Sequence, residues 1–287
     1  MVEGLGKLYV CATPIGNLED ITLRVLRVLK EVDLIAAEDT RVTRKLLAHY
    51  GIHTRMTSYH EHNEASKGPE LIEAMKSGKT VALVSDAGMP GISDPGHRLI
   101  KACIEQGIPV EAVPGPSSLI TALVISGLPT DSFVFQGFLP RKKGERIKLL
   151  TDLLSAGHTI ILFESPRRIA TTLAEVADID PLRDAVIARE LTKKFEEVLR
   201  GTVTQLLELL ERAPVKGEIV LLFGPARRER VVALTEDELR NAVIQLMKNG
   251  VPKKQAISEI ADKFGVSKRT VYEDVKDIHE EDIKDLP

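Results

Sequence analysis

The sequence predicts an α/β protein of two α/β domains, with a small helical module at the C-terminus. Three observations carry this prediction. From residue 7 to about residue 125, short apolar runs alternate with segments of helical periodicity, which is typical of a parallel-rich sheet. From residue 133 the apolar runs become longer and richer in β-branched residues, which favours a second domain with a mixed sheet. From residue 236 the pattern is helical.

We therefore place an N-terminal α/β domain at residues 1–125, a second α/β domain at residues 126–230 and the helical, helix-turn-helix-like module at residues 231–287.

No apolar run approaches the roughly 20 residues that cross a bilayer, and the N-terminus lacks a signal-peptide pattern, so we expect no membrane contact and a cytoplasmic location. The two cysteines exclude a disulfide framework or thiolate zinc site. A net charge of −3 means that a polyanionic partner must meet a local basic patch.

Five polar loops follow apolar runs: TPIGN, AEDTR, SDAGMPGISDPG, PGPSS and ESPRR. Ligands of open α/β sheets bind outside the carboxyl ends of the strands, where these loops lie. Glycine lets a ligand approach the backbone closely, and Asp or Ser supplies hydrogen bonds. The GKT at residues 78–80 precedes a strand and lacks the P-loop glycine, and no GxGxxG follows a strand. The five polar loops thus predict a small-molecule pocket, and they match neither the P-loop nor the dinucleotide-binding loop.

Several long blocks resemble the ribosomal RNA small-subunit methyltransferase I family of the tetrapyrrole-methylase superfamily. They are LYVCATPIGNLEDIT, AAEDTRVTRKLL, VSDAGMPGISDPG, VPGPSSLITALVISGLP, FQGFLPRKKGER, ILFESPRRI, ARELTKKFEE and GEIVLLFGP. The resemblance implies two α/β domains with S-adenosyl-L-methionine in the cleft between them, usually in a homodimer. It also implies methylation of the ribose 2′-hydroxyl of a decoding-centre cytidine, with 16S rRNA or the 30S subunit as partner. The loop ATPIGNLED departs from the GxGxGD turn common in the superfamily, which argues against tetrapyrrole methylation.

The positions of these blocks assign candidate cofactor contacts. Asp86 is the first choice for a polar contact, with turn closure or helix capping as its structural alternative. The remaining candidates fall in the matching loops of both domains: Pro14, Ala87, Gly88, Met89, Ile92, Ser93, Ser117, Ser118, Leu119, Thr121, Phe163, Ala188, Arg189, Gly217 and Glu218.

Methyl transfer to a hydroxyl is helped by a base that takes the hydroxyl proton. Four carboxylates at strand ends are candidates, each beside an arginine, and a structural ion pair is the alternative for each: Glu38, Asp39, Glu164 and Glu190. We expect no metal. His60 and His62 in YHEHNE are read as part of an exposed polar loop and not as a ligand pair.

Phosphates dominate RNA affinity, so we expect contacts at local basic groups. Arg141, Lys142 and Lys143 form one group, and Arg167 with Arg168 forms another. In the tail, Ala261, Gly265 and Val271 have helix-turn-helix spacing, and Lys268 with Arg269 would open the recognition helix. Solvated loops and a purely structural helical cap are the alternatives.

Two other functions compete with the rRNA methyltransferase. A tetrapyrrole C-methyltransferase would need a cleft for a macrocycle with many carboxylates, and would have no use for the helical tail. A non-enzymatic nucleic-acid-binding regulator would read nucleic acid with the tail and sense a metabolite with the body. The polar loops at the strand ends fit a metabolite sensor as well as they fit an enzyme.

Overall fold

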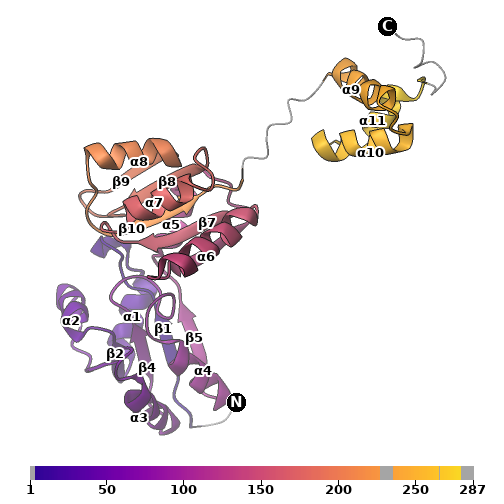
Figure 1. Ribbon diagram of the computed structural model, residues 1–287. Coiled ribbons are helices and arrows are strands. Elements are labelled where there is room, and N and C mark those ends of the chain that lie inside the picture. The colour runs from indigo at the N-terminus through magenta and orange to yellow at the C-terminus, as the bar shows by residue number, and fades with distance from the viewer. Residues whose placement is uncertain (1–3, 227–234, 265, 279–287) are drawn as a thin grey trace. The chain divides into compact units, whose positions relative to one another are not determined.

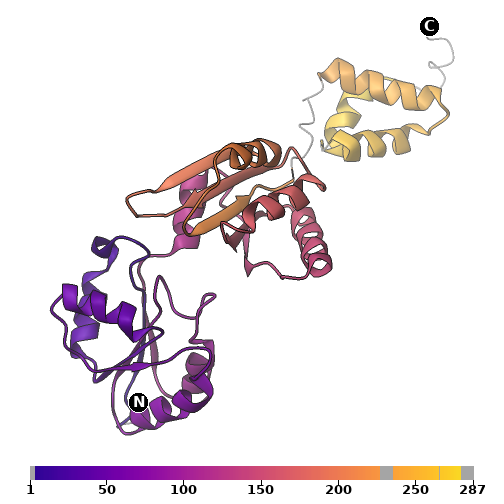
Figure 2. The same cartoon turned by 60° about the vertical axis from the view of Figure 1, so that its left-hand side comes forward.

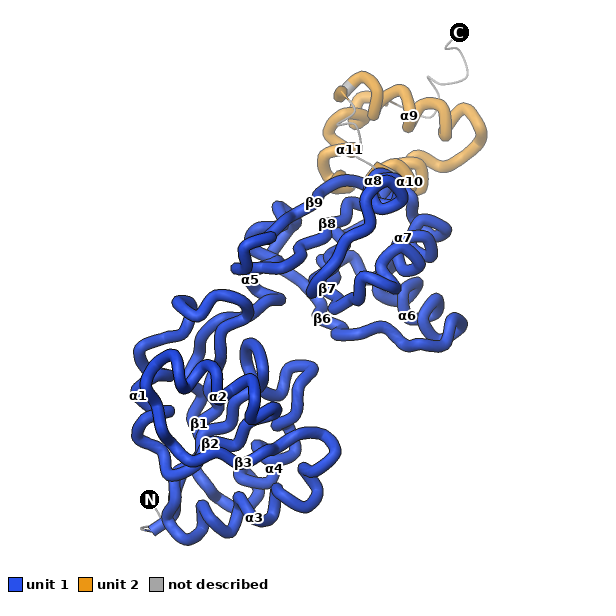
Figure 3. The backbone as a smooth tube through the Cα atoms, turned by 90° about the vertical axis from the view of Figure 1, so that its left-hand side faces the viewer, with its two compact units in different colours: residues 1–226 blue, residues 227–287 orange. Residues whose placement is uncertain are grey.

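The computed structural model describes residues 4–226, 235–264 and 266–278. The chain divides at residue 226 into two compact units (Figure 3). Among the described residues, the first unit contains two five-stranded sheets and the second contains three helices (Figure 1). The predicted fold class is confirmed, because one sheet is parallel, the other is mixed and the C-terminal unit is helical. Among the described residues, no helix has the length and apolar character needed to cross a membrane.

The first sheet is entirely parallel, with the strand order β3-β2-β4-β1-β5. Its strands are β1 (Leu8–Cys11), β2 (Leu34–Ala37), β3 (Met56–Ser58), β4 (Val81–Val84) and β5 (Val110–Val113). Its helices are α1 (Leu23–Glu31), α2 (Thr40–His49), α3 (Glu64–Lys76) and α4 (His97–Glu105), with a short 3-10 helix η1 (Leu18–Asp20) before α1.

Helices cover both faces of this sheet, which explains its unbroken apolar strands. Along β4, Ala82 and Val84 pack on the face covered by α1 and α2. Val81 and Leu83 pack on the opposite face, against α3 and α4. All four side chains are buried, so the sheet is rigid and its polar loops project from a fixed edge.

The second sheet, which Figures 1 and 2 show from two sides, has the order β6-β7-β10-β8-β9. Only β6 and β7 run parallel, and the other three neighbouring pairs are antiparallel. The strands are β6 (Phe133–Phe138), β7 (Thr159–Glu164), β8 (Asp184–Arg189), β9 (Glu197–Thr202) and β10 (Ile219–Phe223). The helices α6 (Lys143–Ser155), α7 (Ile169–Ala177) and α8 (Val203–Arg212) cover one face.

Helix α5 (Ser118–Ser126) covers the other face of the second sheet. Its buried residues Ala122 and Leu123 pack with residues of β7, β8 and β10. The guanidinium of Arg200 on β9 donates hydrogen bonds to the last carbonyls of this helix, those of Ile125 and Ser126, where a cation also favours the helix dipole. The domain boundary expected at residue 125 lies inside this helix, whose buried side belongs to the second sheet.

The C-terminal unit consists of α9 (Glu236–Lys248), α10 (Lys253–Phe264) and α11 (Lys268–Val275) around a core of its own. Ala261 and Val271, two positions of the helix-turn-helix spacing, are buried in that core. Gly265, the third position, lies outside the described residues. Ser267 caps α11 by accepting a hydrogen bond from the backbone N–H of Thr270 at 3.0 Å.

Candidate active site

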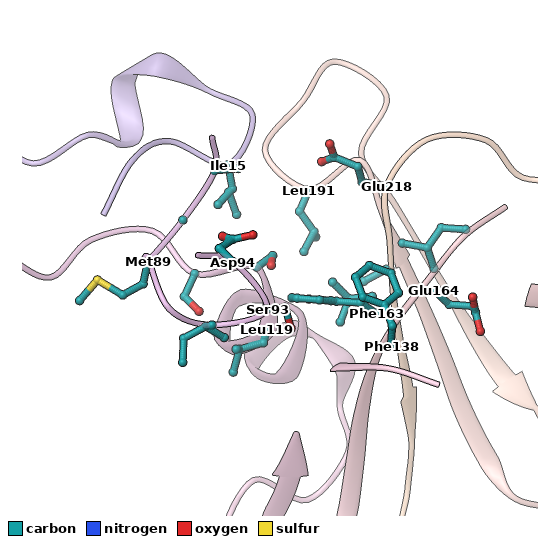
Figure 4. Close-up of a pocket in the computed structure, with 18 residues that line it drawn as sticks. Ile15, Met89, Ser93, Asp94, Leu119, Phe138, Phe163, Glu164, Leu191 and Glu218 are labelled. Atoms are coloured by element: carbon teal, nitrogen blue, oxygen red, sulfur yellow. The ribbon is translucent and has the colours of Figure 1, made fainter. Parts of the chain in front are cut away.

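A cavity of about 290 Å³ lies where the loops of the first sheet meet the second sheet (Figure 4), close to the low end of the roughly 300–1,000 Å³ typical of small-molecule sites. Its walls come from the loop after β1, the loop after β4, the start of α5 and residues on or beside strands β6, β7, β8 and β10. The lining residues are Ile15, Ala87, Gly88, Met89, Ile92, Ser93, Asp94, Ser117, Ser118, Leu119, Phe138, Phe163, Glu164, Ala188, Leu191, Glu218, Ile219 and Val220.

Backbone hydrogen bonds join the loops after β1 and β4. Thr13 and Gly88 exchange both backbone bonds, at 2.9 and 3.0 Å. The buried Thr13 hydroxyl also donates to the carbonyl of Ser85 at 3.0 Å. These bonds hold residues 85–88 at the carboxyl edge of the sheet, so this wall of the cavity is preformed.

Three left-handed residues shape the meeting of the two sheets. Gly88 has φ +78° and Ser93 has φ +61°, although Ser93 carries a Cβ. Such strain persists only where the surroundings enforce it. Gly137 on β6 has φ +73°, and a Cβ there would stand 3.1 Å from the Ser93 hydroxyl oxygen. The loop after β4 is therefore packed directly against the strand that carries Phe138.

The loop after β1 touches the second domain at Gly16. A Cβ at this position would stand 2.7 Å from the carbonyl oxygen of Leu191 and from the hydroxyl of Thr192. Contacts this short require glycine, because the Leu191 carbonyl belongs to the backbone and cannot move aside. The TPIGN turn thus closes one side of the cavity by direct contact.

The start of α5 presents small residues to the cavity, at Ser117 and Ser118. Ser117 stands at the N-cap without donating or accepting a capping bond through its side chain in the described structure. Free N–H groups and the helix dipole favour an anionic group at such a terminus. This end of the cavity is suited to a carboxylate.

Most of the predicted cofactor contacts come together in the cavity: Ala87, Gly88, Met89, Ile92, Ser93, Ser117, Ser118, Leu119, Phe163, Ala188 and Glu218. The other five candidates lie nearby in sequence but are not lining residues: Pro14, Asp86, Thr121, Arg189 and Gly217. Among the five, Arg189 forms an ion pair with Glu197 at 2.7 Å.

Asp86 joins two loops of the first domain. One carboxylate oxygen accepts a hydrogen bond from the backbone N–H of Asp39 at 3.1 Å, and the Asp86 N–H donates to the Glu38 carboxylate at 3.2 Å. Burial, followed by the negative charge of Asp39, outweighs the backbone bond and raises the pKa of Asp86. These contacts fit the structural alternative, in which Asp86 holds the loop.

Asp94 is the carboxylate that the loop after β4 turns toward the cavity (Figure 4). Burial is the main cause that raises its pKa to about 6, and the nearby negative charge of Glu38 adds to it. A carboxyl group with a pKa near neutrality is able to accept a proton in a reaction and release it again. Asp94 is not among the candidate site residues that the sequence analysis names.

Two of the predicted bases belong to the loop after β2. The Glu38 carboxylate accepts from the Asp86 backbone, and burial is the first cause that raises its pKa. Asp39 caps α2 by accepting from the Arg41 N–H at 2.8 Å, and it also pairs with the Arg41 guanidinium. Those hydrogen bonds lower the pKa of Asp39 to about 2, which makes it a poor proton acceptor.

The other two predicted bases have structural contacts. The Glu164 carboxylate is fully buried, points away from the cavity and accepts from the Thr172 hydroxyl at 2.8 Å (Figure 4). These contacts fit the structural alternative for Glu164, although the residue is part of the cavity lining. Glu190 accepts from the backbone N–H of Glu218 and from Lys193, both at 2.9 Å, and these bonds lower its pKa.

The predicted RNA contacts divide by exposure. Arg141, Lys142, Lys143 and Arg167 are exposed. Arg168 instead donates to the carbonyls of Leu139 and Pro140 and pairs with Glu164 at 3.6 Å. It therefore stabilises the backbone at the start of the loop that carries Arg141. Lys268 and Arg269 are exposed at the start of α11 in the separate C-terminal unit.

His60 and His62 lie on the loop after β3 with ring centroids 6.1 Å apart. Within the described residues, no three of the His, Cys, Asp and Glu side chains are grouped to hold a metal ion.

The sequence missed several lining residues of the cavity. Ile15, Leu191, Ile219 and Val220 supply apolar wall, and their short apolar runs carried no signal of ligand contact. Phe138 lies inside the family block FQGFLP, and the exposure of its ring could not be read from alternation along the strand.

The chain matches the family model of the Tetrapyrrole (Corrin/Porphyrin) Methylases over residues 7–207. It is 46% identical to the ribosomal RNA small subunit methyltransferase I of Halalkalibacterium halodurans, over 93% of each chain. It is 48% identical to the protein of the same name from Mesorhizobium japonicum, over 92% of this chain and 90% of that one. Uroporphyrin-III C-methyltransferase of Thermus thermophilus, solved with S-adenosylhomocysteine, shares the fold at 20% identity and a TM-score of 0.56, over 76% of this chain and 97% of that one.

Proposed function

The chain belongs to the ribosomal RNA small subunit methyltransferase I family of the tetrapyrrole methylases, and from this premise we propose that it methylates 16S rRNA. The methyl donor is S-adenosyl-L-methionine. The acceptor is the ribose 2′-hydroxyl of a cytidine in the decoding centre, presented on 16S rRNA or the 30S subunit. Such a substrate places the reaction in the cytoplasm, and by family resemblance the enzyme works as a homodimer.

One observation carries the proposal: the cavity combines small residues with apolar walls beside a basic loop. Gly88, Ser117 and Ser118 leave the backbone open to polar groups of a ligand. Leu119, Leu191 and Phe163 supply apolar surface. The α5 N-terminus suits the amino-acid carboxylate of the donor. These features fit a ligand with an adenosine at one end and a charged amino acid at the other.

The bound donor supplies a methyl group that is already activated by the sulfonium charge. On methyl transfer to the ribose O2′, a bound donor would be left as a neutral thioether, whose sulfur keeps the electron pair of the broken bond to the methyl carbon. The hydroxyl proton leaves to a base. Asp94 faces the cavity and takes this proton, while alignment of the two reactants supplies much of the rate. Glu38 and Asp86 hold the loop that positions Asp94.

The experiment that tests this function supplies methyl-labelled donor together with 30S subunits, naked 16S rRNA or uroporphyrinogen III. We expect label in the ribosomal RNA and none in the tetrapyrrole. Label in the tetrapyrrole alone would support the C-methyltransferase. Tight donor binding with no label in any substrate would support the metabolite sensor.

A further inference from the structure

A β-bulge in β6 determines the direction of Phe138. Phe135 pairs with Ile161 of β7, and the register then shifts, so that Gly137 pairs with Leu162 and Phe138 with Phe163. Side chains alternate along a regular strand, which would put Phe135 and Phe138 on opposite faces. The extra residue, Gln136, places both rings on the face that packs with Phe163. Bulges commonly re-aim a side chain next to an active site.

The ring contacts agree with this register. The Phe163 ring lies 5.0 Å from that of Phe135 and 5.7 Å from that of Phe138, centroid to centroid, in tilted and edge-on arrangements. Phe135 is partly buried, but Phe138 remains 58% exposed although it lines the cavity (Figure 4). Exposing a large aromatic ring to water is costly, so a ligand that covers it would recover that free energy.

The basic loop begins directly after this ring. Arg141 is three residues beyond Phe138, a reach of at most about 10 Å along an extended chain, and Lys142 and Lys143 follow, all exposed. Two contacts of Arg146 fix the loop: it forms a buried, two-pronged ion pair with Glu175 at 2.6 Å, and it donates to the Arg141 carbonyl at 2.9 Å. Phe138 lines the cavity, and the cations follow it closely along the chain in a loop whose backbone is held by Arg146.

We propose that Phe138 is the stacking platform for the base of the nucleotide that is methylated. Proteins that act on single-stranded RNA splay a base out and stack it on an aromatic side chain. Here the base covers the Phe138 ring, the flanking phosphates meet Arg141 to Lys143, and the ribose is brought to the cavity. The inference rests on the proposed rRNA methylation.

The position of the ring favours an RNA base over the adenine of the donor. A cofactor base is enclosed by buried wall, which Ile15 and Leu191 supply in this cavity. Phe138 lies at the exposed side, adjacent to the residues suited to phosphate. A base in an RNA strand can stack on the ring while the phosphates beside it contact the cations, whereas the donor carries no phosphate.

The test compares Phe138→Ala and Phe138→Tyr with the wild-type protein. Loss of one base–aromatic stack should weaken RNA binding by roughly 5- to 150-fold. We expect Phe138→Ala to raise the KM for rRNA to this extent while its affinity for S-adenosylmethionine, measured by calorimetry, stays unchanged. Phe138→Tyr should restore the KM, because its ring also stacks.

Phe133→Ala is the matched control, since Phe133 is an exposed ring at the other end of the same strand; we expect it to keep the wild-type KM. An unchanged KM in Phe138→Ala would overturn the proposal, as would a loss of donor affinity, which would assign the ring to the cofactor. Filter binding of an rRNA fragment measures RNA affinity without methyl transfer, and so tests the stacking on Phe138 separately from the proposed function. If the wild-type protein transfers no methyl group, the proposed function fails, and the effect of Phe138→Ala on RNA affinity still decides the stacking.

Discussion

Gly217 leaves the space that the carboxylate of Glu190 occupies. A Cβ at position 217 would overlap Glu190 Oε1 and Cδ. The backbone at Gly217 is left-handed, with φ +89°, and the next N–H, that of Glu218, donates to Glu190 at 2.9 Å. Two loops of the second domain are thus joined beside the cavity residues Glu218 and Ile219.

Replacing Gly217 with alanine should destabilise the protein and disturb this cavity wall. The side chain adds both left-handed strain and an overlap with Glu190, which together cost about 2–3 kcal/mol of unfolding free energy. Gly157→Ala is the matched control: its φ is +72°, but nothing lies within 4 Å of the added Cβ, so only about 1 kcal/mol should be lost. Chemical denaturation measures both. Equal losses would show that the overlap is relieved at no cost.

The buried ion pair of Arg146 and Glu175 should be essential to the basic loop. Both residues are buried, and their two hydrogen bonds are 2.6 Å long. Arg146→Ala leaves a buried carboxylate without its partner, at a cost of about 3–5 kcal/mol. Replacing the pair together, Arg146→Met with Glu175→Leu, should recover most of that stability. A double variant as unstable as the single one would contradict this explanation.

The exposed cations of the loop should act on RNA and not on stability. We expect the triple variant Arg141→Ala, Lys142→Ala and Lys143→Ala to melt like the wild type and to bind rRNA more weakly. The slope of log affinity against log salt should fall by about 0.7 for each lost phosphate contact. A control variant removes the same charge from α3 and α4, at Lys67, Lys76 and Lys101. If both variants lose the same affinity, only net charge matters.

Asp94 should make stability depend on pH in a defined direction. Its pKa rises from 3.8 to about 6 on folding, chiefly through burial, so the folded state binds the proton more tightly than the unfolded chain. The cost of ionising Asp94 therefore appears between about pH 4 and pH 6 and persists above that range. Asp94→Asn should raise the melting temperature at pH 7.5 but not near pH 4, while slowing methyl transfer. An equal gain at both pH values would contradict the assignment.

Much of the site was predictable because its residues occur in loops at strand ends. The Gly88 and Ser118 loops could be located from the apolar runs before them, since parallel strands bring their carboxyl ends to one edge. Phe138 could not be oriented in this way. Its direction depends on a register shift at Gln136, which local alternation does not reveal.

The roles of the charged residues were harder to predict, because their partners are distant in sequence. The Asp86 carboxylate bonds to the backbone of Asp39, and Arg168 bonds to the backbone of Leu139. Both looked available for a ligand when only their neighbours along the chain were considered. Asp94 was missed for the opposite reason: it gave no signal of a role in the sequence, but in the fold it lines the cavity, and burial raises its pKa.

The most direct test of the central claim is the chemical position of the transferred methyl group. The wild-type protein is incubated with methyl-labelled S-adenosylmethionine and 30S subunits that lack the modification, and the 16S rRNA is digested to nucleosides for mass spectrometry. We expect one labelled product, 2′-O-methylcytidine, from a fragment of the decoding centre. Label on a base, on another nucleoside or in no ribosomal RNA at all would contradict the account.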